Sequence, residues 1–154
     1  MSVDVTVEQA IAAPREQVAA FAMDPANDRR WIGALTEVNV LTEGAVGPGT
    51  QVERIASFLG RRMVYVNEIV DYDPPRRLHM KSVKAPFPMT VAYEFDDAGE
   101  GRALARIRTT GDGSGFYALA APALSAMVRR GVARDLAKLR EVMERPAAPP
   151  SPAA

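Results

Sequence analysis

The stretch APALSAMVRRGVARDLAKLREVME, residues 121–144, decides the fold class of this chain. Its apolar residues recur every three or four positions, which places them on one stripe of a helix with 3.6 residues per turn. The stripe consists of Leu124, Val128, Val132, Leu136, Leu139 and Met143. A helix with one apolar stripe must cover another apolar surface, so we expect the rest of the chain to supply a sheet.

Two residues of this segment depart from an ideal helix. Helical spacing begins at Phe116, so Pro122 predicts a kink, or a short helix up to Ala121 followed by the main one. Gly131 lies mid-helix, where glycine costs about 1 kcal/mol relative to alanine. Close packing, room for a ligand under the helix, or simple tolerance would each explain it.

The chain before this helix has the pattern of an antiparallel sheet. Valines at 3, 5 and 7 alternate with polar residues, as in a half-buried strand. Two short helices follow, one after Pro14 and one from Asp24–Pro25 to Trp31. Six further strands are predicted at residues 35–42, 50–59, 62–72, 77–83, 89–95 and 102–110. Short strands joined by tight turns pair antiparallel.

These elements predict an α+β fold. A curved antiparallel sheet of about seven strands wraps around the long C-terminal helix, with two short helices between strands 1 and 2. The chain of 154 residues suits one domain, expected at residues 1–145. Residues 146–154 contain only Pro, Ala and Ser and are expected to form a disordered tail.

Composition excludes several classes of protein. The 19 basic residues balance 19 acidic ones, which argues against nucleic-acid binding and leaves monomer and homodimer open. The absence of cysteine excludes a thiol nucleophile and Cys-type zinc sites. The sequence has no signal-peptide pattern and no transmembrane-length apolar run, so we expect a cytoplasmic protein.

Four segments, in order, resemble one superfamily. They are VTVEQAIAAPREQVAAFAMDPANDRRWI at 5–32, GAVGPGT at 44–50, EIVDYDPPRRL at 68–78 and the helix at 121–144. Together they resemble the START-like (SRPBCC) superfamily of polyketide cyclase/dehydrase and lipid-transport proteins, with the Bet v 1-like helix-grip fold, over residues 3–144. The resemblance implies a cavity for lipids, sterols, polyketides or hormones. Because the superfamily has no shared catalytic motif, it assigns no catalytic residue here.

The residues expected to line such a cavity are mostly aromatic or methionine side chains. Cavities for small molecules are largely apolar with a few placed polar groups, and methionine adapts to irregular guests. Each residue taken alone is more typical of a core, but a curved sheet over one helix is hard to fill. The candidates are Trp31, Arg54, Met63, Tyr65, Met80, Met89, Tyr93, Phe95, Phe116 and Val128.

The strand at 50–59 has two possible registers. One directs Glu53 inward with Ile55, and the other directs Arg54 inward with Val52 and Ala56. Either buried charge would need a partner or a ligand. Charge at a strand end or barrel mouth is the ordinary alternative.

His79 is the only histidine, and without a second His or any Cys we expect no metal site and no cofactor. Its neighbours Leu78 and Met80 predict that it faces solvent, with a general-base role as the alternative.

Three functions remain open. We favour binding or carriage of a small hydrophobic molecule, lipid or polyketide-like, because no acid–base pair stands out. The first alternative is a polyketide cyclase or dehydratase that uses Tyr65, Tyr93, Arg54 or Glu53. The second is a co-chaperone-like protein-interaction role, which predicts a filled interior and a large exposed apolar patch.

Overall fold

The computed structural model describes residues 3–58, 60–85, 88–111 and 121–145. The predictions for Phe116 and for the tail at 146–154 lie outside these ranges. The elements in chain order are β1 Val3–Ile11, α1 Arg15–Ala22, the 3-10 helix η1 Pro25–Arg30, β2 Leu35–Val40, β3 Gln51–Phe58, β4 Arg61–Asp73, β5 Arg77–Lys84, β6 Met89–Asp97, β7 Ala103–Gly111 and α3 Ala121–Glu144.

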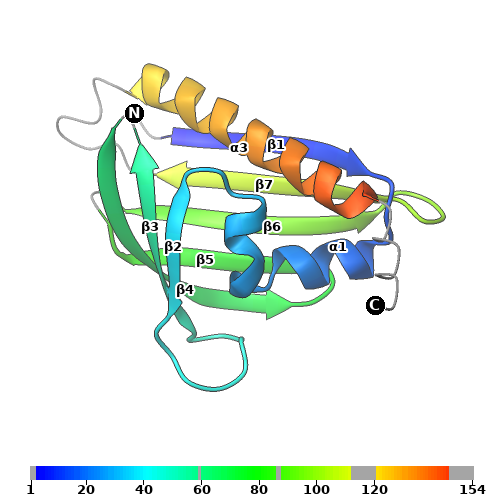
Figure 1. Ribbon diagram of the computed structural model, residues 1–154, viewed down its shortest axis with the longest axis horizontal. Helices are drawn as coiled ribbons and strands as arrows, with labels where there is room; N and C mark the ends of the chain where they lie inside the picture. Colours follow the sequence, from blue (N-terminus) through cyan, green and yellow to red (C-terminus); the bar gives the residue numbers. More distant parts are fainter. Residues whose placement is uncertain (1–2, 59, 86–87, 112–120, 146–154) are drawn as a thin grey trace, which may run out of the picture.

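All seven strands form one sheet in the order β1-β7-β6-β5-β4-β3-β2, and every neighbouring pair is antiparallel. β1 pairs with β7 across the length of the chain, with Val3 opposite Gly111. α1 and η1 connect β1 at one edge of the sheet to β2 at the other (Figure 1). The predicted α+β helix-grip fold is confirmed.

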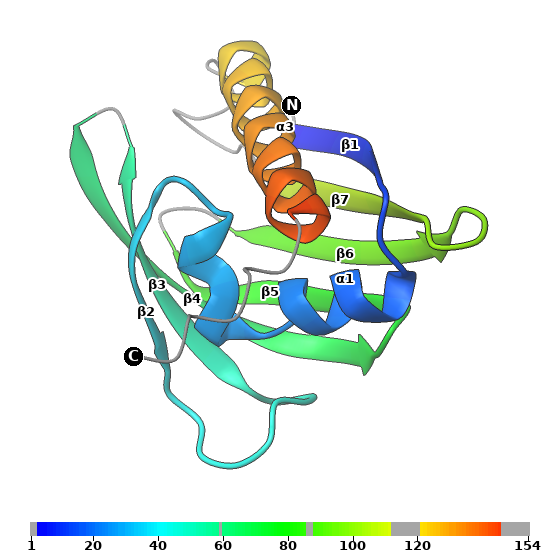
Figure 2. The same cartoon turned by 45° about the vertical axis from the view of Figure 1, so that its right-hand side comes forward.

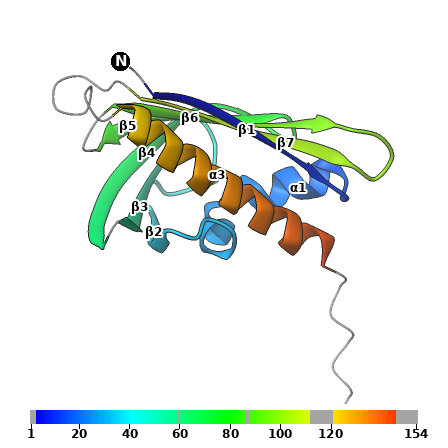
Figure 3. The same ribbon diagram turned by 90° about the horizontal axis from the view of Figure 1, so that it is seen from above.

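The sheet curls around α3. Pairing shifts register between Val66 and Asn67 and between Ile69 and Asp71 of β4, and such irregularities bend and twist a strand. β2, β3 and part of β4 therefore turn away from the plane of β5, β6 and β7 (Figures 2 and 3). α3 lies across the concave face, close to β1 (Figures 1, 2 and 3).

Short-range signals in the sequence account for the ends of the helices. Asp24 begins η1 with a side-chain cap, because its carboxylate accepts the Ala26 N–H at 3.0 Å, and Pro25 occupies the first position of the helix. The described part of α3 begins at Ala121, so Pro122 lies in its first turn. The choice between a kink at Pro122 and a short helix ending at Ala121 depends on residues 112–120, which lie outside the described ranges.

The apolar stripe of α3 is buried unevenly. Leu136 and Leu139 are 1% and 0% exposed and pack in the main core with side chains of α1 and the sheet. Val128 and Val132, nearer the start of the helix, are only half-buried. The second half of α3 thus seals the core, and the first half stands over a space that the sheet and the helix do not fill.

None of the helices in the described ranges is long and apolar enough to span a membrane.

The contribution of the second half of α3 to stability can be tested by shortening one of its buried side chains. Leu139→Ala should lower the free energy of unfolding by about 2–5 kcal/mol, because a buried leucine leaves a cavity when it is shortened. The exposed Lys138→Ala on the same helix is the matched control and should change stability by less than about 0.5 kcal/mol. Urea unfolding of both variants measures the difference, and equal losses would contradict this account.

Candidate functional site

A cavity of about 220 Å³ lies between the first half of α3, the concave face of the sheet and the end of η1. An apolar cavity of about 150 Å³ is enough for a benzene ring, so this one has room for a ring-sized group. Its lining comprises Trp31, Ile32, Ala34, Arg54, Tyr65, Asn67, Met80, Met89, Val91, Tyr93, Ile107, Thr109, Met127, Val128, Gly131, Val132 and Asp135.

Seven of the ten residues named from the sequence meet in this lining. They are Trp31, Arg54, Tyr65, Met80, Met89, Tyr93 and Val128. They come from the end of η1, four strands and α3, so only the folded sheet brings them together.

The remaining three candidates lie elsewhere. Phe95 is 2% exposed and packs in the main core. Met63 pairs with Ala56 across β3 and β4 and is half-buried, but it is not part of the cavity wall. Phe116 lies outside the described residues.

The structure shows that β3 adopts the register in which Arg54, and not Glu53, points into the cavity. The Arg54 side chain points inward and is only 4% exposed. Glu53 instead accepts a hydrogen bond from the Asn39 side chain of β2 at 3.1 Å. The alternative that placed Glu53 in the cavity is therefore wrong, because alternate residues of a strand face opposite sides of the sheet.

The partner of Arg54 is Asp28, which the sequence analysis missed. Arg54 Nε and Nη2 each lie 2.8 Å from Asp28 Oδ2, and both side chains are almost completely buried. In a 3-10 helix residues three apart share a face, so the spacing of Pro25, Asp28 and Trp31 was the available signal.

Burial and charge set the protonation of this pair. Burial raises the pKa of the Asp28 carboxyl, and the charge of Arg54 offsets this only in part. Burial opposes the charge on Arg54, but Asp28, Tyr93 and Tyr65 together raise its pKa. The guanidinium therefore stays charged, and two contacts of 2.8 Å to Asp28 Oδ2 make the two groups a buried ion pair.

Arg54 also presents a nitrogen that Asp28 does not use. Among the described residues, its Nη1 donates only to the thioether sulfur of Met80, at 3.6 Å. A thioether is a weak acceptor, so an oxygen atom in the cavity would be a better partner for this donor.

Two further polar groups in the wall lack partners among the described residues. Trp31 Nε1 and Asn67 Oδ1 are buried without a hydrogen bond there. Trp31 packs edge-on against Tyr93, with ring centroids 5.6 Å apart, which fixes its indole. Burial raises the pKa of Tyr65 and of Tyr93, so both hydroxyls keep their protons.

Asp135 of α3 lies in the wall near the opening. Its Oδ1 accepts the Gly33 N–H at 3.1 Å, which ties α3 to the turn after η1. Burial raises its pKa to about 6, against the opposing effects of the Gly33 hydrogen bond and of Arg134.

His79 lies on the convex face, opposite to its buried neighbours Leu78 and Met80. Its ring nitrogens are 3.9 Å from Asp71 and 3.5 Å from Glu94. Within the described ranges no group of three or more His, Asp or Glu side chains could hold a metal ion.

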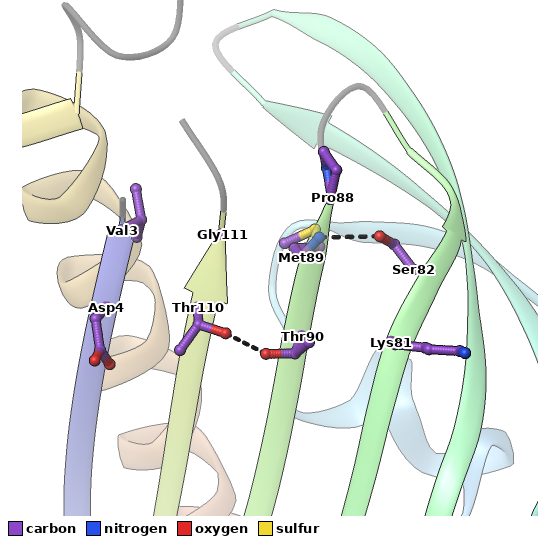
Figure 4. A pocket seen from close by; sticks show the side chains of 9 residues that line it. All are labelled: Val3, Asp4, Lys81, Ser82, Pro88, Met89, Thr90, Thr110 and Gly111. Atoms are coloured by element: carbon purple, nitrogen blue, oxygen red, sulfur yellow. Dashed lines mark hydrogen bonds between the residues drawn. The ribbon is translucent and has the colours of Figure 1, made fainter. Parts of the chain in front are cut away.

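A second hollow, of about 490 Å³, lies at the ends of β1, β5, β6 and β7 (Figure 4). Its polar groups are largely occupied. The Thr90 and Thr110 hydroxyls contact each other, and the Met89 N–H donates to Ser82 Oγ at 2.9 Å. Asp4 binds Arg108 at 3.0 and 2.9 Å. We therefore take the cavity under α3 as the candidate site.

A family model described as polyketide cyclase / dehydrase and lipid transport matches residues 2–144. The chain belongs to this family. A search of curated protein sequences finds no match.

Several solved structures share the fold of this chain at low sequence identity. The Zhui aromatase/cyclase from Streptomyces sp. R1128 is 19% identical with a TM-score of 0.80, covering 94% of this chain and 95% of that one. TTHA0849 from Thermus thermophilus is 20% identical (TM-score 0.77, 90% and 94% covered). A START superfamily protein from Mycobacterium smegmatis is 12% identical (TM-score 0.77, 92% and 97% covered). At these identities the likeness establishes the fold.

The buried pair predicts a non-additive response to mutation. Arg54→Met should destabilise the protein by about 3–5 kcal/mol, because it leaves Asp28 buried without a counter-charge. Asp28→Leu should cost a similar amount, whereas the double variant Asp28→Leu/Arg54→Met should recover most of the loss. Urea unfolding gives the coupling energy, and a double variant as unstable as the sum of the single variants would contradict the pair.

Asp135 predicts a pH dependence of stability. Its pKa is about 6 in the folded protein and about 3.9 in an unfolded chain, so between these values only the unfolded state releases the proton. Stability should therefore fall as pH rises through this window. Asp135→Asn keeps an oxygen for the Gly33 N–H and should abolish the fall, leaving the variant more stable than the wild type at neutral pH. Urea unfolding across this pH range measures both, and identical profiles would contradict the assignment.

Proposed function

We propose that this family member binds a small, largely apolar molecule in the cavity under α3 and holds a polar group of that molecule against Arg54. The observation that carries the proposal is Arg54 Nη1, a buried donor whose one partner in the described part of the chain is the Met80 thioether. A ligand carbonyl or hydroxyl oxygen would accept this hydrogen bond. Because Asp28 already balances the charge of Arg54, the group held there is neutral.

Two other groups support a ligand with a polar end inside the cavity. The Trp31 indole N–H is a donor only, and Asn67 offers an amide, and both lack partners among the described residues. The rest of the wall is mainly valine, isoleucine, methionine and aromatic surface. Burial of an apolar body against it contributes roughly 25 cal/mol per Å² before the costs of association. Lipid-like and polyketide-like molecules combine these two properties.

The cavity also favours binding over a protein-interaction role, since the interaction hypothesis predicted a filled interior. The large apolar residues exposed in the described ranges are Val40, Leu41, Val70 and Val83. They come from three strands and the loop after β2.

Catalysis as a polyketide cyclase or dehydratase is the second candidate. Ionisable groups at one end of the cavity favour it, together with the family description and the aromatase/cyclase among the similar structures. Asp135 in the cavity wall could accept the proton from a carbon next to a ligand carbonyl, and the Arg54 guanidinium could stabilise the enolate oxygen that forms. Tyr65 or Tyr93, which keep their protons, could protonate a departing hydroxyl group so that it leaves as water. Glu53, on the other face, takes no part in this version.

Native mass spectrometry before and after organic extraction tests the binding proposal. The wild-type protein should carry a small molecule that extraction removes, or should melt at a higher temperature with a fatty acid or a fused-ring phenol. Val128→Trp should abolish either effect by filling the cavity, whereas Val70→Trp on the exposed face should preserve it. No bound mass and no thermal shift across such a panel would overturn the proposal.

The same samples separate binding from catalysis. A compound recovered unchanged after incubation supports binding alone. Loss of one water from the compound in the wild type, but not in Tyr65→Phe, would support the dehydratase candidate.

A further inference from the structure

A further space, distinct from the hollow in Figure 4, adjoins the cavity under α3. This vestibule, of about 620 Å³, lies between Gly33, Ala34 and Ser57 on one side and a face of α3 on the other. Ala34, Met127, Gly131 and Asp135 line both the vestibule and the cavity. The two spaces are therefore neighbours that share these four residues.

Gly131 is one of the four shared residues and has no side chain. A Cβ atom placed there would meet no atom within 4 Å, so the space in front of this glycine is open. Glycine is one of the least favourable residues inside a helix, and no close packing at Gly131 accounts for it. A glycine at position 131 would instead be explained by a passage for a ligand between the cavity and the vestibule.

The α3 side of the vestibule carries two arginines, Arg130 and Arg134, one helical turn apart. Like charges at this spacing repel each other. Both side chains are exposed, and within the described ranges neither forms a hydrogen bond or an ion pair.

The other basic residues in and just after α3 are all engaged. Arg129 donates to the Thr6 carbonyl, Lys138 and Arg145 each pair with Glu141, and Arg140 pairs with Glu144. Among the basic residues in and just after α3, the two without partners in the described part of the chain are thus the two that face the vestibule.

We propose that the ligand is an amphipathic acid whose carboxylate or phosphate lies between Arg130 and Arg134. Its apolar body passes Gly131 into the cavity. This inference rests on the proposed function and adds the charge and the orientation of the ligand. An acid is directed outward because Arg54 is already neutralised by Asp28, whereas the vestibule carries two exposed arginines against one carboxylate, Asp135, which accepts the Gly33 N–H.

Titration calorimetry with decanoic acid, decyl phosphate and decanol tests the charge of the ligand. Both acids should bind wild-type protein at least about tenfold more tightly than the alcohol, as expected for hydrogen bonds to a charged group. Arg130→Gln/Arg134→Gln should remove this preference and leave the affinity for decanol unchanged. Lys138→Gln/Arg140→Gln makes the same change of charge outside the vestibule and should keep the preference. The tighter of the two acids identifies the head group.

Substitutions at Gly131 test whether the apolar body of the ligand passes this residue to enter the cavity. Gly131→Leu should weaken binding of all three probes by at least about tenfold, whereas Gly131→Ala should retain binding. Decanol binding as tightly as the acids, or an arginine variant that weakens acid and alcohol alike, would overturn the inference and leave the proposed function standing. Failure of all three probes to bind, together with no extractable molecule in the wild type, would overturn both.

Discussion

A single helix cannot fill the concave face of a curled seven-stranded sheet, and this constraint shapes the rest of the molecule. α3 is a rod with one apolar stripe, whereas the sheet diverges from it as β2, β3 and β4 turn away (Figure 2). Where the walls are close, Leu136 and Leu139 are completely buried. Where they separate, Val128, Gly131 and Val132 face open space. The cavity is therefore a result of the fold's geometry.

The polar character of the cavity depends on the buried pair of Asp28 and Arg54. Asp28 on η1 and Arg54 on β3 join the two elements that close one end of the cavity. In a low-dielectric interior neither charge would be tolerated alone, so each fixes the position of the other. The pair leaves a neutral surface that still offers an N–H donor, which suits a ligand oxygen. Since one fold hosts many functions, this local chemistry, more than the likeness to other structures, supports the proposed ligand.

A network of ion pairs covers part of the convex face of the sheet. On the convex face Arg106 binds Glu8, Glu94 and Asp96, each at 3.0 Å. Such a network keeps the solvent side of an antiparallel sheet polar without leaving charges to recruit a ligand. Against this background, Arg130 and Arg134 at the vestibule differ from the other basic residues of α3.

The sequence by itself determined the fold, because its signals are local. Alternation in β1, the Asp24–Pro25 helix start and the stripe of α3 each act over a few residues, and together they specify an antiparallel sheet closed by one helix. Seven residues of the cavity wall followed, since residues on alternate positions of neighbouring strands must share a face. The tertiary structure alone decided that Arg54 rather than Glu53 points inward and that Asp28 meets it across 26 positions of the chain. Both registers of β3 bury apolar residues on one face or the other, so the pattern could not choose between them. The register depends on the carboxylate of Asp28, which only the folded chain brings into contact with Arg54.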